Sequence, residues 1–382
     1  MANNNDNKVL NVPHLRFPEF SGEWKMCTIG ELTTKVGSGV TPRGGEAVYK
    51  TEGHPFVRSQ NVGLGNLLLD DIAFIDEETH LRQKNTELQF NDVLLNITGA
   101  SIGRSALVDK QIVGGNVNQH VCIIRTKENL VPSFICSFLL SNYGQRQIDS
   151  FQAGGNRQGL NFEQIKSIKI TIPSKDEQIK IAKLLRAIDE RIATQNKIID
   201  KLQSLIKGIA QNVARNNKPN IRLSECLECS SSTLQESDVC KNGTYPVYSA
   251  NGIVGYLDNY NTEKEAVYII KDGSGVGTVS YVTGKCSATG TLNTLQAKEG
   301  YSLQYLYYML KVFNFEPYKT GMAIPHIYFK DYGKAKIFCP SYTEQLKYAR
   351  LLSAIDNKLS AEQSILTDLS LQKQYLLRQM FI

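Results

Sequence analysis

A thirty-residue segment of this chain occurs twice, and that duplication limits the folds that the chain can adopt. The segment from Pro173 to Leu202 returns 167 residues later as Pro340 to Leu369, and 13 of its 30 residues are identical in the two copies. A repeat of this length gives a chain internal pseudo-symmetry, because each copy is a unit that packs in the same way. The sequence therefore predicts two similar surfaces, suited to a target that is itself two-fold.

Each copy is predicted to be a long helix with a coiled-coil seam, because apolar residues recur at alternating spacings of three and four. The first seam consists of Leu185, Ile188, Ile192, Gln195, Ile199 and Leu202, and the second of Leu352, Ile355, Leu359, Glu362, Leu366 and Leu369. The polar members Gln195 and Glu362 have the same register, which favours pairing of the two helices with each other. Ordinary core helices are the alternative, but a seam of about five turns exceeds the usual helix of roughly 11 or 12 residues.

Composition limits the class of protein. Hydrophobic residues make up 41% of the chain, enough for sizeable cores, and no run of about 18 apolar residues is present that would cross a membrane. Residues 1–7 lack the apolar stretch of a secretory signal, and the eight cysteines are scattered, so we expect a cytoplasmic protein. Cys226 and Cys229 have metal-ligand spacing but no second pair, so no metal site is expected. The net charge of +6 is weak support for nucleic-acid binding.

The segments that precede the two helices correspond more loosely. Val93–Gly103 matches Val267–Gly277, and both read as a strand that enters a tight glycine turn. Further on, Gly115–Asn118 is aligned with Gly290–Asn293. These matches predict two globular domains, at residues 1–172 and 213–339, which alternate with long helices at residues 173–212 and 340–382.

The predicted fold class is α/β (α+β). Two mixed, strand-rich domains are separated by two long antiparallel coiled-coil helices with a pseudo-two-fold internal repeat. Antiparallel helices would return the C-terminal end, at Phe381, towards the first domain.

In this arrangement the chain resembles the specificity subunits of type I restriction-modification systems. The resemblance rests on the duplicated Pro-Ser-x-x-Glu-Gln before each helix, on the segment Leu95–Arg104 and on the opening segment Val12–Phe20, and it covers nearly the whole chain. Members of this family carry two target-recognition domains that alternate with two helical conserved regions. The first domain is longer than the second, so we expect the two to read different sequences.

The resemblance implies a DNA-binding subunit without catalytic residues. Each domain would read one half of a bipartite target in double-stranded DNA, and the helices would set the spacer and dock two methyltransferase subunits. Restriction/translocase subunits would complete the complex. S-adenosylmethionine, ATP and Mg²⁺ are expected on these partner subunits and not on this chain. The whole complex would methylate adenine and serve host defence.

Base reading requires side chains that fork onto base edges, such as Arg on guanine and Asn or Gln on adenine, carried on loops or strand ends. In the first domain the candidates are Arg58, Ser59, Gln60, Asn61, Asn96, Thr98, Ser101, Arg104, Asn118, Gln119, His120, Gln152, Asn156, Arg157 and Gln158. In the second they are Tyr248, Ser249, Asn251, Lys271, Asp272, Ser274, Thr289, Thr291, Asn293, Lys319 and His326. Many of these residues also favour turns, where they bond their own backbone.

Enzyme classes find little support in the sequence. Gly99–Arg104 and Gly273–Thr278 resemble phosphate-binding loops, but neither has the dinucleotide-binding spacing or the Gly-Lys-Ser/Thr ending of a P-loop. An adenine methyltransferase would show an Asn/Asp-Pro-Pro-Tyr/Phe motif, and no two prolines are adjacent. Two alternatives remain: a coiled-coil protein-interaction scaffold, and the recognition part of a single-chain restriction-methylation enzyme.

Overall fold

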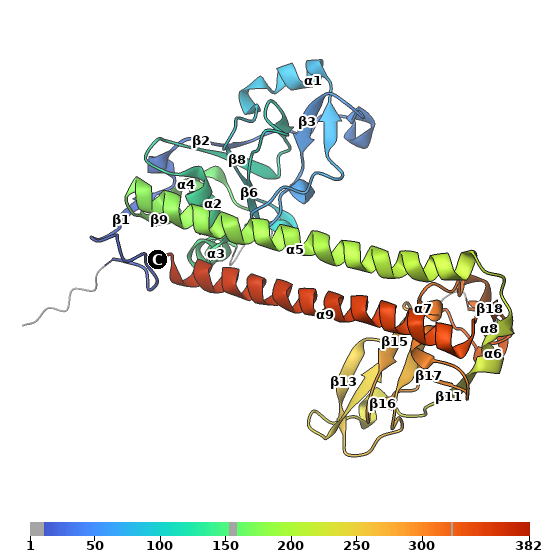
Figure 1. Ribbon diagram of the computed structural model, residues 1–382. Helices are drawn as coiled ribbons and strands as arrows, with labels where there is room; N and C mark the ends of the chain where they lie inside the picture. The colour runs from blue at the N-terminus through green and yellow to red at the C-terminus, as the bar shows by residue number, and fades with distance from the viewer. Residues whose placement is uncertain (1–10, 153–158, 322–323) are drawn as a thin grey trace, which may run out of the picture. The chain divides into compact units, whose positions relative to one another are not determined.

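The computed structural model describes residues 11–152, 159–321 and 324–382, and it divides the chain into two units (Figure 1). Unit 1 comprises Met1–Gln195 and Ile365–Ile382, and unit 2 comprises Asn196–Ser364. Each unit contains one strand-rich domain together with parts of both long helices.

The two predicted long helices are present and continuous. Helix α5 spans Lys175–Arg215 and helix α9 spans Tyr342–Gln379. A helix of 41 residues, such as α5, is about 60 Å long at roughly 1.5 Å per residue. In unit 1 the early part of α5 lies against the late part of α9, where Asp189 Oδ1 is 2.5 Å from Lys373 Nζ.

In unit 2 the other ends of the same two helices meet. The late part of α5 meets the early part of α9, and Ile206 and Leu359 line one pocket. Early α5 therefore packs on late α9, and late α5 on early α9, as Figure 1 also shows. The predicted antiparallel helix pair is confirmed.

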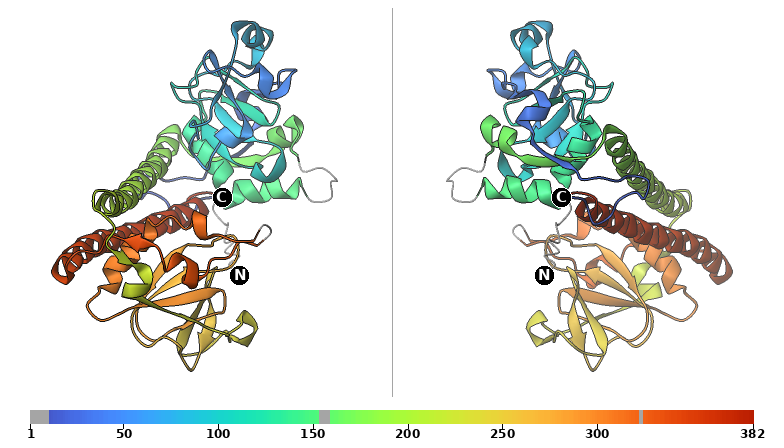
Figure 2. Two further views of the ribbon diagram at one scale, coloured as in Figure 1. Left: turned by 90° about the vertical axis from the view of Figure 1, so that its right-hand side faces the viewer. Right: turned by 90° about the vertical axis from the view of Figure 1, so that its left-hand side faces the viewer.

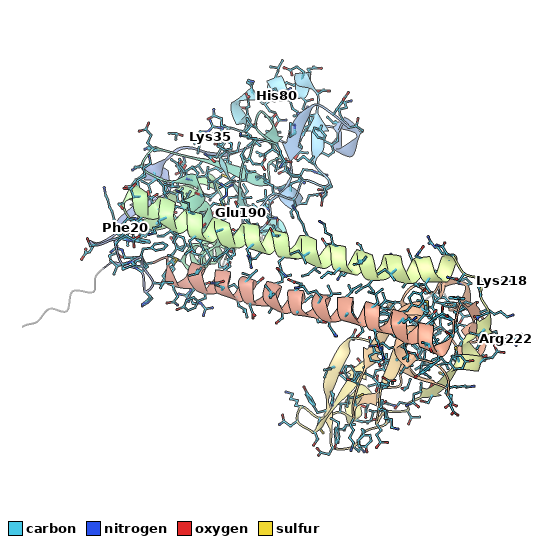
Figure 3. The ribbon with its side chains drawn as sticks, viewed as in Figure 1. Phe20, Lys35, His80, Glu190, Lys218 and Arg222 are labelled. Carbon is cyan, nitrogen blue, oxygen red and sulfur yellow. The ribbon has the colours of Figure 1, made fainter. Side chains whose placement is uncertain are left out.

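The predicted seam residues face inwards along both helices. Buried members are Leu185, Ile188, Gln195, Ile199, Leu352, Leu359 and Glu362, and half-buried members are Ile192, Leu202, Ile355, Leu366 and Leu369. Many of the residues between them are exposed. One example is Glu190 of α5, labelled in Figure 3, whose Oε1 accepts from Arg186 Nε at 2.9 Å. The period of the apolar positions thus matches the buried side of each helix.

The Pro-Ser-x-x-Glu-Gln motif forms the same structural joint in both copies. Gln178 Oε1 accepts from Val131 N at 2.9 Å, at the start of helix α2 (Pro132–Leu140). Gln345 Oε1 accepts from Ser302 N at 2.9 Å, at the start of helix α7 (Leu303–Lys311). Each long helix is therefore tied to the first turn of a short helix in its own domain.

The motif's glutamate, in contrast, is used differently in the two copies. Glu177 is 1% exposed and pairs with Arg16, with the Nε–Oε1 and Nη2–Oε2 distances at 2.7 and 2.8 Å. The hydrogen bond to Glu177 raises the pKa of Arg16. Glu344 is exposed and accepts from Ser341 Oγ at 2.8 Å.

The segment Val12–Phe20, which carries part of the family resemblance, fastens the long helices to the first domain. Leu15 N donates to Gln379 O at 2.9 Å, close to the end of α9. Lys180 of α5 lies over the rings of Phe17 and Phe20, at 4.6 and 6.0 Å from their centroids. Phe20 is labelled in Figure 3. The segment contacts both helices within unit 1.

Among the described residues, the domain of unit 1 forms three small sheets. Strands β1 (Lys25–Thr28) and β9 (Lys169–Ile172) form an antiparallel pair. The antiparallel four-stranded sheet has the order β2 (Thr33–Ser38), β8 (Val121–Thr126), β5 (Val93–Asn96) and β6 (Ser105–Leu107). The three-stranded sheet has the order β4 (Ala73–Ile75), β3 (His54–Val57) and β7 (Asn116–Val117), and β3 and β7 run parallel. Helices α1 (Glu77–Arg82), α2, α3 (Asn142–Ser150) and α4 (Phe162–Ser167) complete the domain.

The domain of unit 2 repeats this plan (Figure 2). Its two-stranded sheet pairs β10 (Ile221–Arg222) with β18 (Lys336–Ile337). Its four-stranded sheet has the order β11 (Leu227–Ser231), β17 (Leu292–Ala297), β14 (Ala266–Ile270) and β15 (Val279–Val282). Its three-stranded sheet has the order β13 (Gly252–Leu257), β12 (Tyr245–Ser249) and β16 (Ser287–Ala288), and β12 and β16 run parallel. Helices α6 (Leu223–Cys226), α7 and α8 (Phe329–Tyr332) accompany the sheets.

The alignment of Gly115–Asn118 with Gly290–Asn293 is wrong. Asn118 N donates to Val57 O at 3.0 Å, and the same bond in unit 2 is made by Thr289, whose N donates to Tyr248 O at 2.9 Å. Asn118 therefore corresponds to Thr289. The glycines misled the alignment, because they sit before β7 in one domain and after β16 in the other.

The C-terminal end of the chain returns to the first domain as predicted. Phe381 is 0% exposed and packs against Phe134 and Phe138 of α2, with ring centroids 5.2 and 6.2 Å away. Among residues 11–152, 159–321 and 324–382, no helix is long and apolar enough to cross a bilayer.

We expect Phe381→Ala to destabilise unit 1, because it leaves a cavity in the core where α9 meets the first domain. Removing a buried phenylalanine side chain costs about 3–5 kcal/mol. Phe90→Ala, at a ring that is 56% exposed in the same domain, is the matched control and should cost less than about 0.5 kcal/mol. Thermal unfolding of the purified chain measures both, and equal shifts would contradict the docking role of Phe381.

Candidate nucleic-acid interface

Three turns of the first domain meet at the ends of β3, β5 and β7. The turn after β5 is tied to the turn after β7, because Ile97 N donates to His120 O at 3.0 Å. It is also tied to the turn after β3, because Asn96 Nδ2 donates to Ser59 O at 2.8 Å. The structure thus brings most candidates of the first domain to one corner.

The predicted glycine turns are the same structural element in both domains. After β5, Gly103 N donates to Asn96 O at 3.0 Å, and after β14, Gly277 N donates to Ile270 O at 2.9 Å. Gly99, Gly103, Gly273 and Gly277 all have positive φ between 71° and 96°, which L side chains rarely adopt. The glycines serve to close these turns.

The candidates differ widely in exposure. Exposed candidates are Gln60, Arg104, Gln119, Asn251 and Ser274. Half-buried candidates are Arg58, Ser59, Thr98, Ser101, His120, Gln152, Tyr248, Lys271, Asp272, Thr291, Lys319 and His326. Buried candidates are Asn61, Asn96, Asn118, Ser249, Thr289 and Asn293. Asn156, Arg157 and Gln158 lie outside the residues that the structure describes.

Asp71, which the sequence did not single out, organises the turn after β3. Its backbone oxygen accepts from Arg58 Nη2 at 2.7 Å, and its Oδ1 accepts from Asn61 Nδ2 at 2.9 Å. Gln60 also donates to this carboxylate. Arg58 stacks over Tyr49, with its guanidinium 5.4 Å from the ring centroid. These side chains hold the shape of the turn, and Gln60 and Asp71 are the exposed ones among them.

Asn96 is the buried centre of the same corner. It is 0% exposed, and its Nδ2 donates to Ser59 O and to Ser101 Oγ, the latter at 3.1 Å. Its Oδ1 has no hydrogen-bond partner among the described residues. A buried unpaired oxygen costs free energy, so the site favours a further donor.

Arg104 is the exposed cation of this corner. It follows Gly103 at the end of the glycine turn, and its side chain has no ion pair among the described residues. An exposed arginine without a carboxylate partner keeps all its donors for phosphate or a base edge.

In unit 2 the corresponding corner contains a histidine–carboxylate pair. His326 Nδ1 lies 2.9 Å from Asp272 Oδ1, and Lys271 Nζ is 4.0 Å from Asp272 Oδ2. Thr289 Oγ1 is 2.9 Å from Thr291 Oγ1. Backbone bonds match those of unit 1: Lys271 N donates to Thr291 O as Ile97 N donates to His120 O. Basic and acidic side chains therefore both lie at this turn.

The part of the chain that the structure describes has no cluster of metal ligands, and the thiols of Cys226 and Cys229 are unreactive. No group of three or more His, Cys, Asp or Glu side chains is arranged there to hold a metal ion. Burial raises the pKa of Cys226 to about 12 and that of Cys229 to about 11. At neutral pH both thiols are therefore protonated, and a protonated thiol is a poor nucleophile.

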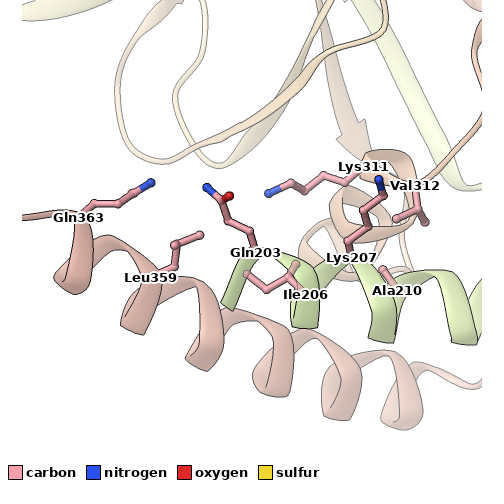
Figure 4. A pocket seen from close by; sticks show the side chains of 8 residues that line it. All are labelled: Gln203, Ile206, Lys207, Ala210, Lys311, Val312, Leu359 and Gln363. Carbon is pink, nitrogen blue, oxygen red and sulfur yellow. The ribbon is translucent and has the colours of Figure 1, made fainter. Parts of the chain in front are cut away.

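Unit 2 has a pocket of about 430 Å³ between its helices (Figure 4). It is lined by Gln203, Ile206, Lys207 and Ala210 of α5, Leu359 and Gln363 of α9, and Lys311 and Val312 at the end of α7. Its apolar floor is flanked by Lys207 and Lys311.

Comparison with known proteins identifies the family. The sequence matches the family described as type I restriction modification DNA specificity domain over residues 21–204 and again over residues 219–370. These two matches cover most of the chain, so the protein belongs to the type I restriction-modification specificity subunit family. The predicted resemblance is confirmed.

Relatives agree with this assignment. A putative type I specificity subunit of Mycoplasma genitalium is 25% identical over 320 residues, which cover 76% of this chain and 81% of the relative. The EcoKI specificity subunit of Escherichia coli K12 is 22% identical over 202 residues, which cover 50% of this chain and 41% of the relative.

Solved structures share the fold. The crystal structure of a type I restriction-modification S subunit from M. genitalium has a TM-score of 0.68 at 18% identity, covering 97% of this chain and 99% of that one. A structure from work on complex assembly and conformational transition of the type I system has a TM-score of 0.54 at 16% identity, covering 93% and 96%. The predicted fold class is confirmed.

We expect Arg104→Gln to weaken DNA binding, because it removes an exposed charge that could pair with a phosphate. Loss of one phosphate contact lowers the slope of log affinity against log salt by about 1. Arg82→Gln is the matched control, since Arg82 is 74% exposed and already pairs with Glu78. Fluorescence anisotropy over a salt series measures both slopes, and an unchanged slope for Arg104→Gln would remove it from the interface.

Proposed function

We propose that this chain directs a type I restriction-modification complex to a bipartite DNA sequence. Each recognition domain reads one half-site, and the base pairs of the spacer between the half-sites are not read. One observation carries this proposal: the two domains share one strand order, while equivalent turn positions carry different side chains, such as Thr98 and Asp272. A duplicated scaffold with different loops suits a two-part target with two different halves.

The chemistry is proposed to reside on partner subunits. This chain supplies recognition and no catalytic residues. Two methyltransferase subunits would bind S-adenosylmethionine and methylate an adenine in each half-site, and restriction/translocase subunits would use ATP and Mg²⁺. The glycine turns, which close on their own backbone, support a binding role for this chain.

The long helices are proposed to set the spacer and to dock the methyltransferase subunits. A helix of about 60 Å is longer than one turn of B-DNA, roughly 34 Å, so it suits a spacer between two major-groove contacts. Apolar side chains remain on the outside of α9, where Leu371 and Tyr375 are each 56% exposed one turn apart. Exposed apolar pairs of this kind favour a protein partner.

The two alternatives fit less well. A coiled-coil scaffold would not need two recognition domains with matching strand orders, and the family match covers both domains as well as the helices. The relatives that match over most of this chain are named as specificity subunits and not as single-chain enzymes.

The decisive experiment is a methylation map. The chain is co-expressed with a cognate methyltransferase subunit in cells without other methylation, and modified adenines are sequenced genome-wide. We expect a split motif with two short specified blocks and a fixed gap. Exchange of residues 213–339 for the same region of a relative should change one block only. A continuous motif, or a change in both blocks, would contradict one half-site per domain.

A second test addresses docking. Leu371→Glu combined with Tyr375→Glu should abolish co-purification with the methyltransferase subunit, because it places charge on an apolar contact. Circular dichroism should be unchanged, since both side chains are exposed. Gln374→Glu, a charge on an exposed polar position of the same helix, is the control and should leave co-purification intact. Retention of the partner by the double variant would move the docking surface elsewhere.

A further inference from the structure

Gln119 is exposed, yet both ends of its side-chain amide are held. Its Oε1 accepts from Thr41 N at 3.1 Å, and its Nε2 lies 3.3 Å from His120 Nε2. Exposed glutamines ordinarily keep several rotamers, and ordering one costs conformational entropy. A side chain that is ordered before a ligand arrives avoids that cost on binding. This arrangement singles out Gln119 among the exposed candidates.

The hydrogen-bond directions follow from the partners. Thr41 N can only donate, so the amide atom facing it is the oxygen, and Nε2 faces His120. An amide nitrogen only donates, so His120 Nε2 accepts, and the ring hydrogen is on Nδ1. That nitrogen donates to Thr98 Oγ1 at 2.6 Å. His120 and Thr98 therefore position the amide of Gln119.

The backbone is shaped to deliver Thr41 to this amide. Gly39 lies so close to β7 that a Cβ at this position would be 1.7 Å from Val117 O. Only glycine permits this approach, which carries the chain after β2 past the turn that holds Gln119. On the other side, His120 N donates to Asn118 Oδ1 at 3.0 Å, and Asn118 is 6% exposed. The turn is thus fixed from both flanks.

We infer that Gln119 reads an adenine in the half-site of the first domain, an inference that rests on the proposed function. Each amide atom keeps one unused bonding position, a lone pair on Oε1 and a hydrogen on Nε2. In the major groove adenine offers the N6 amino donor beside the N7 acceptor, which matches this pair. Guanine offers two acceptors there, cytosine only a donor, and thymine an acceptor beside a methyl group. His120 and Thr98 are positioning residues for this contact.

The test is the motif methylated by the complete complex, compared between wild type and Gln119→Ala. We expect one A·T pair in one block to become unspecified, with a loss of discrimination of roughly ten-fold or more at that position. All other positions and the gap should remain. Relaxation at a G·C pair, relaxation in both blocks or an unchanged motif would each overturn the adenine assignment. If wild type itself gives no split motif, the proposed function fails and the assignment falls with it.

Two further variants test the same assignment if Gln119→Ala reduces all methylation. Gln119→Glu keeps the acceptor but removes the donor, so the same position should admit cytosine as well as adenine, because both offer an amino group. His120→Phe should relax that position less than Gln119→Ala, since the amide stays but is no longer held. Gln111→Ala is the matched control, an exposed glutamine of the same domain that bonds Asp109, and should leave the motif unchanged. Effects of these variants on different positions would mean a structural role only.

Discussion

Each recognition domain is joined to its long helix through one buried glutamine. Gln178 and Gln345 are 1% and 2% exposed, and each amide bonds the first turn of a short helix on one side and a proline carbonyl on the other. Loss of such a side chain would leave buried donors and acceptors unpaired, which costs more than the net value of the bonds themselves. Within each unit this joint helps to fix the direction of the loops relative to the helix.

The side chains of the loops can vary because backbone hydrogen bonds hold the loops in place. The turn after β5 and the turn after β14 make the same backbone hydrogen bonds, although their side chains differ. At equivalent positions stand Thr98 and Asp272, and each anchors the Nδ1 of an imidazole. In unit 1 that imidazole is His120 from the turn after β7, and in unit 2 it is His326 from the loop before α8. One scaffold thus presents two different surfaces.

The sequence alone was sufficient for the helices, because a heptad pattern is a local signal that survives without knowledge of the fold. It was less informative for the loops. Asn61 and Asn96 have the amide side chain of a base reader, but both are buried. Their hydrogen-bond partners, Asp71 and Ser59, lie elsewhere along the chain. Asp71 and the backbone N–H of Thr41 were missed for the same reason, since no spacing rule connects them to the turns that they hold. Gly115 and Gly290 were wrongly aligned because turns tolerate glycine at several positions.

Rigid loops are a requirement of sequence reading and not a by-product of folding. A mismatched base is rejected only if the protein group that it fails to satisfy cannot move to another partner. Buried anchors such as Asn118 provide that constraint, because their own bonds would have to break before the turn could shift. Specificity can therefore change through the exposed positions of a turn while the buried positions keep its geometry. This separation explains why the repeat is plain in the helices, where both copies make the same joint, and faint in the domains, where only the backbone is shared.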